Sequence, residues 1–230
     1  MTRAGRAEPH SVHMKKLLLA AAAVVALAGC TSAPPPEPVA SPSASSASPT
    51  PSPTPEPKVD EVVITSAGLR LLDDGAELDA LGWFDLAEES IAALTNAFGS
   101  EPEEVPYPGH IEAAPGTDYK WDGFVFRVQD FEAEPPLWSN ISVISSVSRV
   151  GDVAICTGDG LTIGSPTSAV QALNPPIANP YEHEGLSYTY FAVEQIEIES
   201  PSTHNFVGVR VENDRGLVVE LNAPSADYGV

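Results

Sequence analysis

The sequence Thr65-Ser66-Ala67-Gly68-Leu69-Arg70-Leu71 recurs in weaker form as Thr157-Gly158-Asp159-Gly160-Leu161-Thr162-Ile163, 92 positions further along the chain. Three of the seven aligned residues are identical. Each copy lies at the end of an apolar, β-branched run, Val59–Thr65 or Val153–Thr157, and precedes a segment with helical character. The shared order of elements predicts a β–turn–α–β–β unit that occurs twice.

The segment Phe84–Phe98 has the clearest helical pattern in the chain, with apolar residues spaced by three and four at Phe84, Ala87, Ile91, Leu94 and Phe98. Asp85 and Glu88 resemble a capping box, and Gly99 ends the pattern. A shorter helix is expected after Ser165, as its N-cap, with Pro166 at the first position. The apolar stripe of the first helix requires a sheet to cover it.

Alternating or apolar runs predict further strands at 120–131, 141–150, 186–198, 206–212 and 217–221. Together these elements predict an α+β fold, an antiparallel sheet with helices on one face. The head would span residues 59–230, with tandem β-α-β-β units at 59–150 and 151–230.

The N-terminal region resembles a bacterial lipoprotein signal. Lys15-Lys16 precede an apolar run from Leu17 to Ala28, which ends in the lipobox Leu27-Ala28-Gly29-Cys30. The resemblance implies that residues 1–29 are a signal peptide recognised at Leu27, Ala28 and Gly29. It also implies that Cys30 carries a diacylglycerol, with palmitate-type acyl chains, at the extracytoplasmic face of the cell membrane. The alternatives are a plain secretory signal and an uncleaved anchor helix, but an anchor needs about 20 apolar residues, more than this run has.

Met14 is a better start for such a signal than Met1, because Glu8 and Pro9 interrupt the residues before it. Residues 1–13 are therefore expected to be a non-native start.

Residues 30–58 are expected to be the lipidated Cys and a stalk rich in Pro, Ser, Ala and Thr. Such a composition buries too little apolar surface to offset the conformational entropy that is lost when a chain becomes ordered. Stalks of this composition after a lipobox are similar to those of actinobacterial lipoproteins.

The chain is strongly acidic, with a formal net charge of −21. This charge repels phosphate backbones and argues against nucleic acid as a partner. The membrane is expected to be contacted through the lipid on Cys30, and a protein or envelope component is the other expected partner. Because the acidic residues are spread along the chain, solubility explains them better than a basic partner or divalent cations does.

No residue pattern predicts catalysis or a cofactor. The sequence lacks a Gly-x-Ser-x-Gly elbow, a phosphate loop and a His-Glu-x-x-His motif. Cys156 lies in an apolar run and is expected to be a small core residue rather than a nucleophile. No metal site is predicted; the nearest to one is a possible calcium loop around Gly75, formed by Asp73, Asp74, Glu77 and Asp79, which lacks EF-hand spacing.

The predicted element order, with a Thr-x-x-Gly-Leu turn before a helix, is similar to that of secreted β-lactamase-inhibitor proteins and of small outer-membrane assembly lipoproteins. This likeness implies only a tandem-repeat fold, since fold alone does not transfer function. The function expected is that of a membrane-anchored, non-catalytic binding or accessory module. The alternatives are an inhibitor-like protein that binds a secreted enzyme, and a hydrolase with an unrecognised carboxylate site.

Overall fold

A computed structural model describes residues 57–111, 113–198 and 204–227. The residues of the lipobox, Leu27, Ala28, Gly29 and Cys30, and nearly all of the stalk lie outside this part of the chain. Within it the chain forms thirteen strands and two helices. In these ranges no helix combines the length and the apolar character needed to cross a membrane.

The smaller sheet has five strands in the order β3-β2-β1-β9-β8. Strands β1 and β9 pair in parallel, with Val62 opposite Ile155, and the remaining neighbours are antiparallel. The bounds of these strands are β1 (Glu61–Ile64), β2 (Gly68–Asp73), β3 (Ala76–Gly82), β8 (Arg149–Val150) and β9 (Val153–Thr157).

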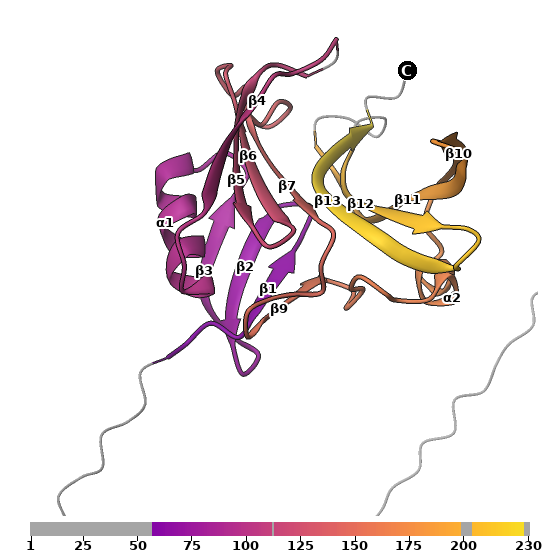
Figure 1. Ribbon diagram of the computed structural model, residues 1–230, viewed down its shortest axis with the longest axis horizontal. Coiled ribbons are helices and arrows are strands. Elements are labelled where there is room, and N and C mark those ends of the chain that lie inside the picture. Colours follow the sequence, from indigo (N-terminus) through magenta and orange to yellow (C-terminus); the bar gives the residue numbers. More distant parts are fainter. Residues whose placement is uncertain (1–56, 112, 199–203, 228–230) are drawn as a thin grey trace, which may run out of the picture. The chain divides into compact units, whose positions relative to one another are not determined.

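The larger sheet has eight strands in the order β10-β11-β12-β13-β7-β6-β5-β4, all antiparallel. Each of its halves is a meander of four consecutive strands, and the halves join along β7 and β13 (Figure 1). The bounds are β4 (Glu103–Tyr107), β5 (Gly116–Trp121), β6 (Phe124–Gln129), β7 (Ile141–Ser145), β10 (Ile177–His183), β11 (Leu186–Glu197), β12 (His204–Glu212) and β13 (Leu217–Asp227).

One hydrophobic core lies between the two sheets. Every second residue of β6 and β7 lies on the core side, where Phe124, Phe126 and Val143 are buried and Val128 is partly buried. These side chains share a single apolar cluster with Val62 and Ile64 of the smaller sheet. Because successive side chains of a strand point to opposite faces of a sheet, the intervening side chains of β6 and β7 lie on the opposite, outer face of the large sheet.

The two helices, α1 (Ala87–Phe98) and α2 (Thr167–Ala172), occur at the places where the sequence predicts helices. Leu94 of α1 is fully buried, and the ring of Phe98 lies 5.4 Å from that of Trp121 and 5.3 Å from that of Phe124. The helix ends at Gly99, which has a left-handed φ of 70° and donates its N–H to the Thr95 carbonyl.

Both predicted N-caps are wrong. Leu86 precedes α1 without a side-chain capping bond, and the Asp85 carboxylate instead accepts from the Gly82 N–H. In the same way Pro166 precedes α2, and the Ser165 hydroxyl accepts from the Thr162 N–H at 3.0 Å.

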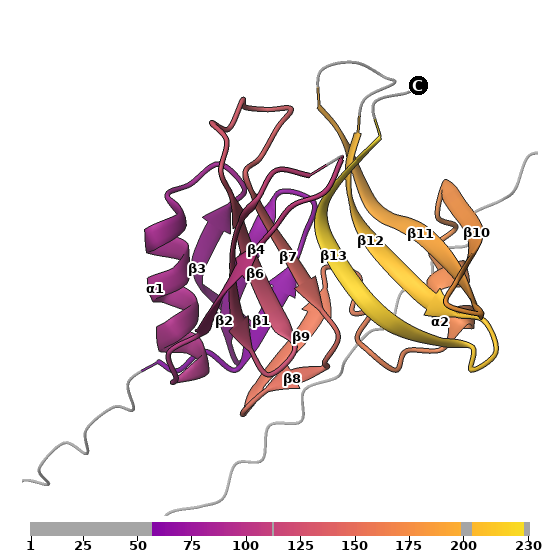
Figure 2. The ribbon, with the colours of Figure 1, turned by 45° about the horizontal axis from the view of Figure 1, so that its top comes forward.

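The predicted α+β class is also wrong. Strand residues greatly outnumber helical ones, and two sheets pack on one another in a β-sandwich-like arrangement instead of one sheet covered by helices (Figures 1 and 2). Four strands of the large sheet follow each helix, so the unit is not β-α-β-β. The physical reason is that helix α2 has only six residues and buries only Val170, so strands supply most of the core.

The two Thr-containing turns lie at the ends of the paired strands β1 and β9. The Thr65 hydroxyl accepts from the Gly68 N–H at 3.1 Å, and the Thr157 hydroxyl accepts from the Leu161 N–H at 3.1 Å. Glu194, at a bulge in β11, accepts from the Ser66 N–H at 3.2 Å, and its other carboxylate oxygen lies against the Gly158 backbone. One carboxylate thus contacts both turns.

Candidate functional site

The outer face of the large sheet is the face turned away from the five-stranded sheet. One row of its residues crosses four strands in register: Lys120, Val125, Ile144 and Asn222. None of these four side chains is fully buried, whereas their neighbours along each strand point into the core. The partial exposure of this row leaves the face accessible to an external ligand.

In the first half of the sheet the outer face carries a paired charge cluster. Arg127 donates to both oxygens of Asp118, at 2.6 and 3.1 Å, and Lys120 lies 3.8 Å from the same carboxylate. The Arg127 guanidinium also lies 3.5 Å from the centre of the Tyr107 ring. The negative charge of Asp118 is therefore paired with two cationic side chains, and these contacts stabilise the pairing of β4, β5 and β6.

The second half carries a network of uncharged polar groups. The Tyr190 hydroxyl lies 2.8 Å from both Asn222 Oδ1 and Ser225 Oγ, and the Ser225 hydroxyl donates to Asn222 Oδ1 at 2.6 Å. Burial is the main cause that raises the pKa of Tyr190 above its ordinary value of 10.0, so the phenol is neutral at physiological pH.

Gly208 makes this network possible. It lies on the outer face opposite Asn222, and a Cβ built on it would overlap the Tyr190 hydroxyl oxygen and Asn222 Oδ1. Only a residue without a side chain lets the Tyr190 ring cross β12 and reach Asn222 on β13.

Two open hollows adjoin the Tyr190–Asn222 network, and together we call them the central groove. The first is about 660 Å³ and lies at the junction of the two halves, where Ser142, Ile144, Asn222 and Ser225 contribute to its wall. The second is about 610 Å³ and extends toward β10, where Ile177 and Asn179 line it. Both are lined by Tyr190, Phe206 and Ala226, so the two hollows adjoin one another at these residues. Figure 2 shows the junction of β7 with β13, along which the first hollow lies.

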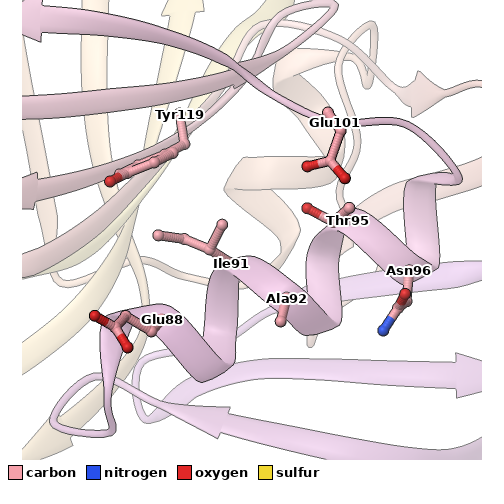
Figure 3. Close-up of a pocket in the computed structure, with 7 residues that line it drawn as sticks. All are labelled: Glu88, Ile91, Ala92, Thr95, Asn96, Glu101 and Tyr119. Atoms are coloured by element: carbon pink, nitrogen blue, oxygen red, sulfur yellow. The ribbon is translucent and has the colours of Figure 1, made fainter.

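A third hollow of about 480 Å³ lies between α1 and β5 (Figure 3). Ile91 and Tyr119 provide its apolar wall, and the carboxylates of Glu88 and Glu101 lie at its sides. The pKa of the Tyr119 phenol is raised, first by burial and then by the negative charges of Glu104 and Glu88. This hollow is therefore acidic, in contrast to the central groove.

The candidate calcium loop is not assembled. Its residues lie on the hairpin formed by β2 and β3, where Glu77 is held 2.6 Å from Arg70 and Asp79 Oδ1 accepts from the Ala80 N–H. Among the residues that the structure describes, no group of three or more His, Cys, Asp or Glu side chains is placed to hold a metal ion.

Cys156 lies half-buried in β9, and its thiol donates to the Glu61 carboxylate on β1 at 3.2 Å. Burial, followed by the hydrogen bond and negative charge of Glu61, raises the pKa of the Cys156 thiol to about 12. The thiol is thus held in its unreactive, protonated form at neutral pH.

The aromatic residues divide between core and surface in a way that the sequence leaves open. Trp83 and Trp121 are buried, and the Trp83 indole donates to the Ser66 carbonyl at 3.0 Å. Tyr181 and Tyr188 stack on one another on the outer face, with ring centres 5.6 Å apart, next to Tyr190. The outer face of β10–β12 is therefore rich in tyrosine.

Comparison with known proteins adds no assignment to this geometry: a scan of protein families, a search of curated proteins and a search of solved structures found no match to the chain.

Proposed function

We propose that this chain is a lipid-anchored, extracytoplasmic binding module, which holds a ligand at the central groove of its large sheet without catalysing a reaction. The observation that carries the proposal is the central groove itself, whose lining residues lie largely on the outer face of that sheet. Small-molecule and peptide sites are typically concave, with apolar walls and a few fixed polar groups, as this groove has.

The anchor rests on the sequence of the lipobox. Cys30→Ser should abolish lipidation, because the thiol is the acceptor of the diacylglycerol in such signals. Expressed in a bacterial host, the unaltered full-length protein should partition into the detergent phase of Triton X-114, and the Cys30→Ser protein into the aqueous phase. Full partition of the Cys30→Ser protein into detergent would overturn the anchor.

The binding role is tested by cosedimentation of the Cys30→Ser protein with isolated cell envelopes of its source bacterium. Ile144→Arg places a long charged side chain in the central groove, whereas Val125→Arg places the same side chain on the directly paired strand, on the same face but outside the groove. We expect the protein and the Val125→Arg variant to sediment with envelopes, and Ile144→Arg to stay in the supernatant. Equal sedimentation of the two variants would show that the groove is not the binding surface.

A further inference from the structure

The central groove is uncharged in a highly charged molecule. The chain has a net charge of −21, yet no Asp, Glu, Lys or Arg side chain is among the described residues that line the two hollows. Its polar groups are the hydroxyls of Ser142, Tyr190 and Ser225 and the amides of Asn179 and Asn222. Its apolar walls include Ile144 and Phe206.

Charged side chains beside the groove are ion-paired, including Arg127, which lies opposite the lining residue Ser142 and pairs with Asp118. Glu220 accepts a long hydrogen bond of 3.4 Å from the Asn222 amide, and it is held 2.6 Å from Arg210 in an ion pair. His110 lies in the lining of the first hollow, on the loop between β4 and β5, and is the one ionisable side chain there besides the neutral Tyr190. The described lining therefore carries no fixed charge of either sign.

These properties exclude several ligand classes. An anionic ligand is repelled by the net charge of the protein, and a cationic ligand finds no unpaired carboxylate in the groove. A wholly apolar ligand would cover polar groups of the wall, such as the Ser142 hydroxyl and the Asn179 amide, without offering them a hydrogen bond, at a cost in free energy. A neutral molecule with many hydroxyl groups and weakly polar faces can form hydrogen bonds with the polar wall of the groove and also contact its apolar wall.

We propose that the central groove binds an uncharged carbohydrate chain, an inference that rests on the proposed binding role of this groove. The hydroxyls and amides supply both donors and acceptors, which match the hydroxyl groups of a sugar. The partly exposed Tyr190 ring stands where the two hollows meet and offers apolar surface to the C–H groups of a sugar ring, and the buried Phe206 ring supports it at a centre-to-centre distance of 6.3 Å.

The groove is also large and held in shape before binding. Each hollow falls within the range of about 300–1,000 Å³ that is common for small-molecule sites, so the two together suit an oligosaccharide better than a single sugar. The hydrogen bonds among Tyr190, Asn222 and Ser225 fix the polar wall between strands β11 and β13, so little ordering is required when a ligand binds.

The test uses the full-length Cys30→Ser protein labelled with ¹⁵N, titrated with neutral hexasaccharides of glucose, xylose, mannose, galactose and arabinose. The charged probes are an oligogalacturonate and a chitosan oligomer of the same length. We expect at least one neutral hexasaccharide to shift the amide signals of Ile144, Tyr190 and Asn222 with a Kd below about 1 mM, and the charged probes to leave them unmoved.

The variants locate the site. Tyr190→Phe keeps the ring but removes its hydroxyl, and Asn222→Ala removes the amide; each should weaken binding about tenfold, because each leaves a hydrogen-bonding group of the sugar unpaired. Ile144→Arg should abolish binding, and Val125→Arg should leave it within about twofold of the unaltered protein. Thermal melts of all four variants identify any that fail to fold, and Ile144→Arg and Val125→Arg serve as the matched pair if the network variants do not fold.

The proposal is overturned if no neutral hexasaccharide binds at about 10 mM, or if the charged probes bind equally well. Shifts confined to residues outside the groove would also overturn it. These results differ from those that would disprove the binding role. If no sugar binds but Ile144→Arg still prevents sedimentation with envelopes, the groove remains a binding surface and only carbohydrate is excluded as its ligand.

Discussion

At the scale of single residues, Gly208 is the position on which the polar wall of the groove depends. We expect Gly208→Ala to lower the free energy of unfolding by about 1–3 kcal/mol, because the added methyl group would displace the Tyr190 hydroxyl from Asn222 and Ser225. Urea denaturation measures this loss. In a Tyr190→Ala background the same substitution should cost less, since the overlap with the Tyr190 hydroxyl is gone and only the one with Asn222 Oδ1 remains. An equal cost in both backgrounds would show that the overlap with Tyr190 is not its cause.

Cys156 offers a second residue-level prediction. In the Cys30→Ser background it is the only thiol of the chain, and its pKa of about 12 against an ordinary value of 9.0 leaves about a thousandfold fewer thiolates near pH 8. Alkylation by iodoacetamide should therefore be far slower in the folded protein than in urea, and its rate should keep rising with pH beyond pH 10.

Glu61 provides the control for this prediction. Glu61→Gln removes the negative charge next to the thiol, which should lower the pKa and speed alkylation, although burial should still keep it slower than in urea. A labelling rate that levels off near pH 9 in the unaltered folded protein would contradict the raised pKa.

At the scale of elements, helix α1 depends on the packing of one face. Leu94→Ala should cost about 2–5 kcal/mol, because Leu94 is fully buried next to the core and its loss leaves a cavity. Glu89→Ala changes an exposed residue of the same helix and should cost less than about 0.5 kcal/mol. Chemical denaturation of the two variants, compared side by side, tests this, and equal small losses would mean that the α1 face does not pack as described.

Helix α1 and most of the longer strands could be predicted from the sequence, because their apolar spacing is long and regular. The hairpins were harder. Residues 120–131 alternate throughout and suggest one strand, but Asp122 and Gly123 both have positive φ and form the turn between β5 and β6. Asp74 and Gly75 form a similar turn between β2 and β3. Asp-Gly at such a place is a signal for a two-residue hairpin, and it overrides the surrounding alternation.

The two edge strands of the large sheet escaped prediction for another reason. Strand β4 contains Pro106 and strand β10 contains Pro180, and proline lacks the N–H that an inner strand would donate. Both strands are also largely exposed, so neither has the apolar pattern of a core element. Their positions are set by pairing with β5 and β11, which is a tertiary contact that local sequence does not encode.

The groove could not be predicted either, because its walls come from strands far apart in the sequence. Ile144 and Asn222 meet only through the pairing of β7 with β13. One local signal was available: Gly208 interrupts an otherwise β-branched strand, and a glycine there often marks close approach of another group. Which group approaches depends on the register of three strands, so Tyr190 could not be identified in advance.

At the scale of the whole described head, several contacts connect its first half, up to residue 150, to its second half, from residue 151 onward. Strand β1 pairs with β9, β7 pairs with β13, and Glu194 on β11 accepts from Ser66 in the turn after β1. The pKa of Glu194 is raised, chiefly by burial, so its ionised form is disfavoured in the folded state. Any stability that it contributes is present below its unfolded pKa and is lost as the pH rises through the raised folded pKa. Near neutral pH, the contact that Glu194 makes between the two halves is therefore weakened by the free energy needed to ionise a buried carboxyl group.

Because one apolar core spans both sheets and both halves, the head should unfold in a single cooperative step. The three tryptophans, Trp83, Trp121 and Trp138, all lie before residue 150, so their fluorescence reports on the first half of the head alone. Far-ultraviolet circular dichroism reports on the strands of both halves. In urea, the two signals of the Cys30→Ser protein should give the same midpoint and the same slope. A fluorescence midpoint that differs from the dichroism midpoint would show that the β1–β9 and β7–β13 pairings are too weak to couple the halves.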